Sequence, residues 1–214
     1  MTVTEITEIN KTKSKIYIDH EFAFVLYKGE IHKNNIRQGE EISQQIYDFL
    51  TGEVLPKRAK LRAMHLLTKR PYTERKLRQK LQESMYTEEC IDIAIAYVKS
   101  YGYIDDTQYA CDFINYHSSS MSRKQIETKL SQKGISQEVI RLAYEKECPM
   151  GQEKLELEQI MSLFHKRYDG RMPEEPGDRM KMMQFFQRKG YSPNMVKNAL
   201  KAVNEDGILD EIYN

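Results

Sequence analysis

Three segments of this chain carry one pattern of residues, and successive copies lie 49 and then 56 positions apart. Each copy has a helix-capping residue, apolar residues four and eight positions later, a large apolar residue at the thirteenth position and then a second capping residue. The copies begin at Thr73, Ser122 and Asp178, and the same apolar spacing continues beyond each second cap. One spacing kept through three copies indicates a tandem repeat rather than chance matches between helical segments.

Capping residues followed by apolar residues at helical spacing predict three helices in each repeat. One such unit has too small a core to be stable alone, so neighbouring units must bury each other's apolar faces. We therefore expect a mainly α fold in which tandem three-helix repeats form an elongated, curved array. The expected repeats span residues 56–104, 105–150 and 151–214. The seven extra residues before the third copy coincide with a loop at 171–177 that contains proline and glycine.

Residues 1–55 differ from the repeats and predict a small unit made of a β-hairpin and a helix. Segments 15–19 and 21–27 alternate apolar and polar residues, as short strands do, and the Asp19-His20 pair suggests a turn between them. Apolar residues at helical spacing predict a helix over residues 40–50. Residues 1–14 are polar, and we expect them to be frayed. A lone hairpin is marginal in water, so this unit must pack against another part of the chain.

The stretch from Tyr101 to Tyr116 joins the first repeat to the second. Gly102 stands where a left-handed residue would end a helix. Asp105 and Asp106 are good N-caps for the following helix. Capping explains this pair of carboxylates better than a metal site or an acid–base pair does.

The net charge of +1 conceals a strongly basic segment, because residues 57–80 hold ten basic residues and one acidic residue. This segment predicts a surface for DNA phosphates or for an acidic protein filament, with a weaker counterpart in the second repeat. The alternative is a solvated helix face whose charges pair with the acidic segment 81–120. The candidate filament- or DNA-binding residues are Lys69, Arg70, Arg75, Lys76, Arg78, Lys80, Arg123, Lys124, Lys129 and Lys133.

The chain also has 14 tyrosines, several of them near the junction between the first two repeats. Aromatic side chains can stack on bases, but at helical spacing packing between helices is the favoured interpretation. This interpretation covers Tyr72, Tyr86, Tyr101, Tyr103, Tyr109 and Tyr116.

No motif in the sequence predicts catalysis, a cofactor or a metal site. The three cysteines are far apart, the histidines have no metal-ligand spacing, and no phosphate-binding glycine loop or nucleophile motif is present. No apolar run is long enough to span a bilayer, and the polar first residues do not resemble a signal peptide. We expect a cytoplasmic, non-enzymatic protein without a cofactor.

Residues 57–205 resemble the RecX family of bacterial RecA regulators. The matching segments are Arg70-Pro71-Tyr72-Thr73, Tyr101-Gly-Tyr-Ile-Asp-Asp106, Leu130-Ser-Gln-Lys-Gly-Ile-Ser136 and Arg188-Lys-Gly-Tyr-Ser192. The third copy is looser, with Met182 and Phe186 where leucine is usual. The resemblance implies a protein of tandem three-helix repeats that binds RecA and its filament on single-stranded DNA. It also implies restraint of RecA ATP hydrolysis, strand exchange and coprotease activity in DNA repair and the SOS response.

Two other functions remain open from the residues themselves. Capped three-helix units also resemble helix-turn-helix modules, so the chain could bind DNA directly without RecA. A helical-repeat scaffold for another protein is the second alternative. We expect a monomer in each case, with no membrane partner.

Overall fold

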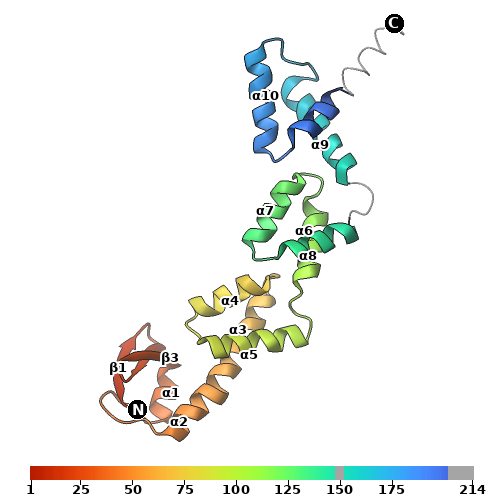
Figure 1. Cartoon of the computed structure of the whole chain (residues 1–214). Coiled ribbons are helices and arrows are strands. Elements are labelled where there is room, and N and C mark those ends of the chain that lie inside the picture. Colours follow the sequence, from red (N-terminus) through yellow and green to blue (C-terminus); the bar gives the residue numbers. More distant parts are fainter. Residues whose placement is uncertain (148–151, 202–214) are drawn as a thin grey trace. The chain divides into compact units, whose positions relative to one another are not determined.

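The computed structural model describes residues 1–147 and 152–201. The chain divides into two compact units, Met1–Asp105 and Asp106–Asn214. The fold class is confirmed as mainly α with a small β element near the N-terminus (Figure 1). The finer division at residues 55, 104 and 150 and the curved array stay predictions.

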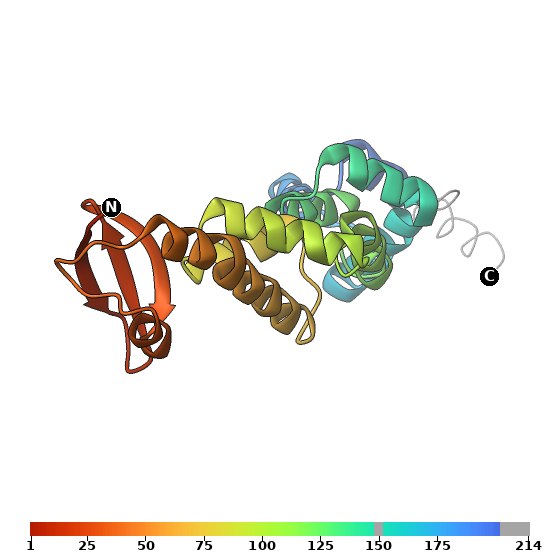
Figure 2. The same ribbon diagram turned by 90° about the horizontal axis from the view of Figure 1, so that it is seen from below.

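The N-terminal β element is a three-stranded antiparallel sheet, not the two-stranded hairpin that the sequence predicts (Figure 2). Its strands are β1 (Val3–Glu8), β2 (Lys13–Ile18) and β3 (Glu21–Tyr27), in that order across the sheet. The expectation that residues 1–14 are frayed was wrong. Val3 is buried and Ile6 packs on the same core, although residues three apart face opposite sides of a regular strand. A bulge between Val3 and Glu5 shifts the register and disrupts the alternation that marks a strand in sequence.

The chain leaves the sheet through the short helix α1 (Lys28–Lys33) and then enters a continuous helical run. The run consists of α2 (Gln44–Phe49), the π-helical turn η1 (Leu50–Val54) and α3 (Leu55–Leu67). Ser43 caps it, because its hydroxyl oxygen accepts the amide of Ile46 at 3.3 Å. The π turn ends at Val54, two residues before Pro56, which has no amide hydrogen to donate to a regular helix ladder.

Helices α3, α4 (Glu74–Glu83) and α5 (Glu88–Ser100) form a three-helix group whose core is continuous with that of the sheet. Leu77 and Leu81 of α4 are fully buried, as the repeat pattern predicts. Gly102 follows α5 with a φ of +67°, which confirms the left-handed residue expected at this helix end. The packing partner required by the N-terminal unit is therefore the first three-helix group.

The second unit contains two further helix groups. The first comprises α6 (Asp106–His117), α7 (Arg123–Gln132) and α8 (Gln137–Glu147), and the second comprises α9 (Gln152–Tyr168), α10 (Pro176–Arg188) and helical residues 193–201. The repeat positions Ile126, Leu130, Met182 and Phe186 are all buried. One cap was predicted wrongly: α10 begins at Pro176, which suits the first helical turn, so Asp178 lies inside the helix.

These two helix groups contact each other closely at the start of α7. The Ser122 hydroxyl donates to the carbonyl oxygen of Lys189 at 2.6 Å, and the backbone amide of Arg123 donates to Glu156 at 2.7 Å. Gly190, with a φ of +90°, permits this approach, since a Cβ there would lie 2.5 Å from the Ser122 oxygen. The pair Lys189-Gly190, which precedes the second cap of the third repeat, thus both ends a helix and allows two helix groups to pack closely.

Candidate binding surface

Helix α4 presents part of the basic segment to solvent because its opposite face is buried. Thr73 caps the helix, accepting the backbone amide of Lys76 at 3.3 Å. Leu77 and Leu81 point into the core. Arg75, on the other side of the helix, is exposed. The repeat pattern that builds the core therefore also fixes which cations face outward.

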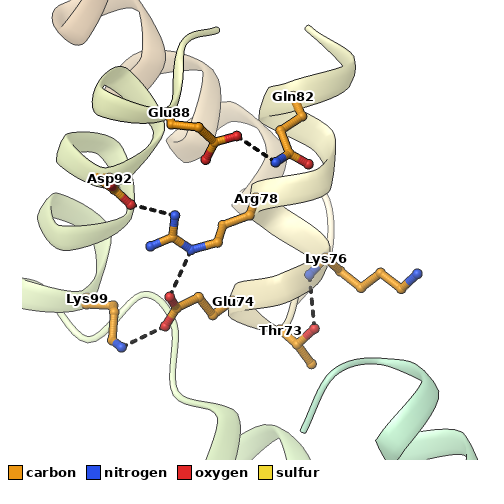
Figure 3. Close-up of polar contacts among 8 residues, drawn as sticks. All are labelled: Thr73, Glu74, Lys76, Arg78, Gln82, Glu88, Asp92 and Lys99. Carbon is orange, nitrogen blue, oxygen red and sulfur yellow. Dashed lines mark hydrogen bonds and ion pairs between the residues drawn. The ribbon is translucent and has the colours of Figure 1, made fainter. Parts of the chain in front are cut away.

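Arg78 lies on the side of α4 that faces α5, where it joins a network of polar contacts (Figure 3). Its Nε donates to Glu74 at 3.0 Å, and another guanidinium nitrogen donates to Asp92 of α5 at 2.6 Å. Lys99 donates to the second Glu74 oxygen at 2.7 Å. Gln82 and Glu88 add a further contact between the same helices at 2.8 Å. The network links α4 to both ends of α5.

These contacts stabilise the charged forms of the groups involved. The hydrogen bond from Lys99, followed by that from Arg78, lowers the pKa of Glu74. The hydrogen bond to Asp92 raises the pKa of Arg78 further above its ordinary value. The positive charge of Arg78 is thus already matched by carboxylates of its own unit, unlike the charges of Arg75 and Lys76 on the same helix.

The remaining cations of the basic segment are less engaged. In the fully described stretch 57–80, Lys69 and Arg75 are exposed and make no ion pair. Arg70 stacks over the Tyr72 ring at 4.7 Å, and Lys76 donates only to neutral Gln79. Lys80 pairs with Glu83. We define the α4 basic surface as Lys69, Arg70, Arg75 and Lys76.

The second group of candidate cations lies on and just after α7. Arg123 pairs with Glu127 at 2.7 Å and stacks over the Tyr144 ring at 4.7 Å. Lys133 lies over the rings of Tyr109 and Phe113, at 5.5 and 5.6 Å from their centroids. Lys124 and Lys129 are exposed, and the described residues offer them no ion pair. In this group, Lys124 and Lys129 are therefore the cations most available for a partner.

The tyrosines near the junction are only partly core residues, so the packing interpretation was wrong for three of them. Tyr101, Tyr103 and Tyr116 are 60%, 52% and 80% exposed. The rings of Tyr101 and Tyr103 stack nearly parallel, with centroids 5.7 Å apart. Both lie beyond the last residue of α5, where helical spacing no longer determines their direction. Tyr97 extends the cluster, because its ring centroid lies 4.9 Å from that of Tyr101. The Lys60 ammonium lies over the Tyr97 ring, 5.1 Å from its centroid.

The described residues contain no cluster of metal-ligating side chains. No helix among them is both long and apolar enough to cross a membrane. Cys90 and Cys111 are buried, and burial raises the pKa of both thiols. Buried Glu156 also has a raised pKa, through desolvation, and its carboxylate accepts the Arg123 amide. These three side chains are buried within the fold. The exposed cations and aromatic rings are therefore the groups that a partner could contact.

Two protein-family models match this chain. The model described as RecX, first three-helix domain, matches residues 59–97, which include all of α4 and most of α3 and α5. The model described as RecX, third three-helix domain, matches residues 155–200, from α9 to the last described helix. The first match contains the whole of the α4 basic surface.

Full-length relatives are similar over nearly the whole chain. Regulatory protein RecX of Caldanaerobacter subterraneus subsp. tengcongensis is 29% identical, over 95% of this chain and 99% of its own length. Regulatory protein RecX of Clostridium botulinum (strain Eklund 17B) is 26% identical over 95% and 96%. Two crystal structures share the fold. One, of a regulatory protein RecX, has a TM-score of 0.59 and 23% identity and covers 92% of this chain and 98% of its own. The other, of RecX from Lactobacillus salivarius, has a TM-score of 0.61 and 20% identity and covers 71% of this chain and 97% of its own.

Proposed function

This chain belongs to the RecX family of regulatory proteins, and on that premise we propose that it regulates a RecA recombinase. It binds RecA and the filament that RecA forms on single-stranded DNA. Binding restrains ATP hydrolysis, strand exchange and coprotease activity. The protein acts by binding alone, as a monomer, without catalysis or a cofactor.

The α4 basic surface is the observation that supports this proposal most strongly. It concentrates four cations on one exposed helix face and the preceding loop, and none of them forms an ion pair among residues 57–80. When such a surface neutralises DNA phosphates, counterions leave the DNA, and that release drives association. An acidic protein face would attract the same cations by charge complementarity. Lys124 and Lys129 provide a second, smaller contact in the other unit.

Direct contact with DNA is supported by a separate observation, the exposed tyrosine cluster. Tyr101 and Tyr103 present stacked, solvent-exposed rings in the same unit as the α4 basic surface. Base stacking on tyrosine is tolerant of sequence, as binding along a filament requires. This contact would also serve a protein that binds single-stranded DNA without RecA.

A filament-binding experiment tests the proposal. We expect the triple variant Lys69→Ala, Arg70→Ala, Arg75→Ala to bind assembled RecA filaments about tenfold more weakly or worse at low salt. The logarithmic salt slope should fall by up to about three, because each phosphate contact contributes about one. The control removes the same charge from exposed lysines elsewhere, through Lys11→Ala, Lys33→Ala and Lys166→Ala.

Equal binding and equal salt slopes for the two triple variants would contradict a role for the α4 basic surface. A parallel titration uses the same DNA without RecA. Stronger binding to the filament than to bare DNA supports a filament regulator. Equal binding to both would favour a DNA-binding protein that acts without RecA.

A further inference from the structure

A cavity of about 650 Å³ lies between the N-terminal sheet and the first helix group. Its walls come from the turn before β2, the end of β3, α3 and the turn that follows α4. All of these elements belong to the unit Met1–Asp105. The volume is in the range of cavities that hold small ligands. The cavity lies apart from the exposed face of α4, and the proposed function leaves it without a role.

The cavity has an excess of positive charge. Lys13, Arg58 and Arg62 line it, and Glu83 is the one carboxylate among its lining residues. Glu83 is already paired with Lys80, outside the lining. Within the described residues, neither Lys13 nor Arg62 has an ion-pair partner. A site with two unmatched cations attracts an anion.

Arg58 adds a directed hydrogen-bond donor to this positive charge. One guanidinium nitrogen binds Glu30 at 2.8 Å and the Val25 carbonyl oxygen at 3.3 Å. The Nε of Arg58 is buried and has no hydrogen-bond acceptor in the described structure. Leaving this donor unpaired is unfavourable, and a small rotation of the Arg58 guanidinium toward a ligand oxygen in the cavity would satisfy it.

Aromatic and apolar side chains form the rest of the cavity wall. The Tyr27 ring has the Arg58 guanidinium at 4.4 Å and the Lys13 ammonium at 5.0 Å from its centroid. Tyr86 and the exposed Leu61 also line the cavity. Cations beside tyrosine rings suit a ligand with a phosphate and a planar ring. We propose that this cavity binds a nucleotide, either free or as one unit of a single-stranded nucleic acid.

The test measures binding of AMP and of a short oligothymidylate to the full-length protein by titration calorimetry. The double variant Lys13→Gln, Arg62→Gln removes one cation from β2 and one from α3. The control, Lys15→Gln with Lys57→Gln, removes one cation from each of the same elements outside the cavity. We expect the cavity variant to lose at least tenfold in affinity and the control to lose less than twofold.

A pair of isosteric substitutions at Leu61 tests the sign of the charge without touching a cation. Leu61 is 58% exposed, so both Leu61→Glu and Leu61→Gln should fold. We expect Leu61→Glu to bind about fivefold to tenfold more weakly than Leu61→Gln, because it places a negative charge beside the phosphate.

Loss of AMP binding in the cavity variant supports a free nucleotide as the ligand. Loss of oligothymidylate binding alone supports a nucleotide unit of a nucleic acid. Absence of binding to both probes, or equal binding by the cavity variant and its control, overturns the proposal. The filament experiment on the α4 basic surface is independent of these outcomes.

Discussion

Replacing Arg78 should destabilise the protein, whereas the same change at Arg75 should not. Arg78→Met removes contacts to Glu74 and Asp92 that join α4 to α5. The side chains are 32%, 29% and 64% exposed, so each pair is screened by solvent and contributes about 0.5–1 kcal/mol. The expected loss is therefore about 1–2 kcal/mol in the free energy of unfolding. Arg75 makes no ion pair within its described unit, and Arg75→Met should change stability by less than about 0.5 kcal/mol.

Urea denaturation followed by circular dichroism measures this difference, and salt and acid identify its origin. In 1 M salt the Debye length falls to about 3 Å, so the gap between the variants should shrink. The lowered pKa of Glu74 means that its stabilising contribution is complete above its unfolded value of 4.5 and is lost as the pH falls below it. The wild type and Arg78→Met should therefore converge in stability at acidic pH.

The same two variants should rank in the opposite order by their loss of affinity for the filament. Arg75→Met removes a cation of the α4 basic surface and should weaken binding, while Arg78→Met should weaken it less. A double-mutant cycle with Asp92→Asn should give a coupling energy of about 0.5–1 kcal/mol with Arg78. Equal urea midpoints for the two variants, with no coupling to Asp92, would refute the structural role assigned to Arg78.

Three further predictions concern the cores and helix ends. In the same urea assay, Gly190→Ala should lower the free energy of unfolding by about 2–3 kcal/mol, because its Cβ would lie 2.5 Å from the Ser122 hydroxyl oxygen. Gly39 also has a positive φ but has open space around it, so Gly39→Ala should lower it by only about 1 kcal/mol. Leu77→Ala should cost about 2–5 kcal/mol, since Leu77 is fully buried, and a cost under 1 kcal/mol would contradict that burial. Burial raises the pKa of Tyr191 from 10.0 to about 12, so stability should fall as the pH rises from 10 to 12, and Tyr191→Phe should reduce that fall by about 2–3 kcal/mol. An identical pH profile for both proteins would show that Tyr191 titrates normally.

The repeated helices could be predicted from the sequence because their determinants are local. Caps such as Thr73 and Ser122 bind amides within three residues, and the buried positions follow the 3.6-residue period. Gly102 and Gly134 both have positive φ, as residues that end helices often do. In these elements each residue's role depends on neighbours a few positions away, which the sequence shows directly.

The features that sequence reasoning missed depend on contacts between distant segments. Strand β1 pairs through a bulge, so Val3 and Ile6 do not alternate as strand residues should. Arg78 is engaged because α5 brings Asp92 beside it, and composition alone could not separate it from Arg75. Charge counts find a basic segment, but only the helix packing shows which cations are matched. The candidate site was thus predicted as a region, and its individual residues remain to be tested.

RecA ATP hydrolysis on single-stranded DNA, with this protein titrated in, tests the central claim most directly. The account predicts inhibition at well below one molecule per RecA, because a regulator of the filament acts on more than one protomer. The triple variant of Lys69, Arg70 and Arg75 should inhibit less than the control triple variant at each concentration. Full ATPase activity at saturating amounts of the folded wild-type protein would contradict the proposed regulation of RecA.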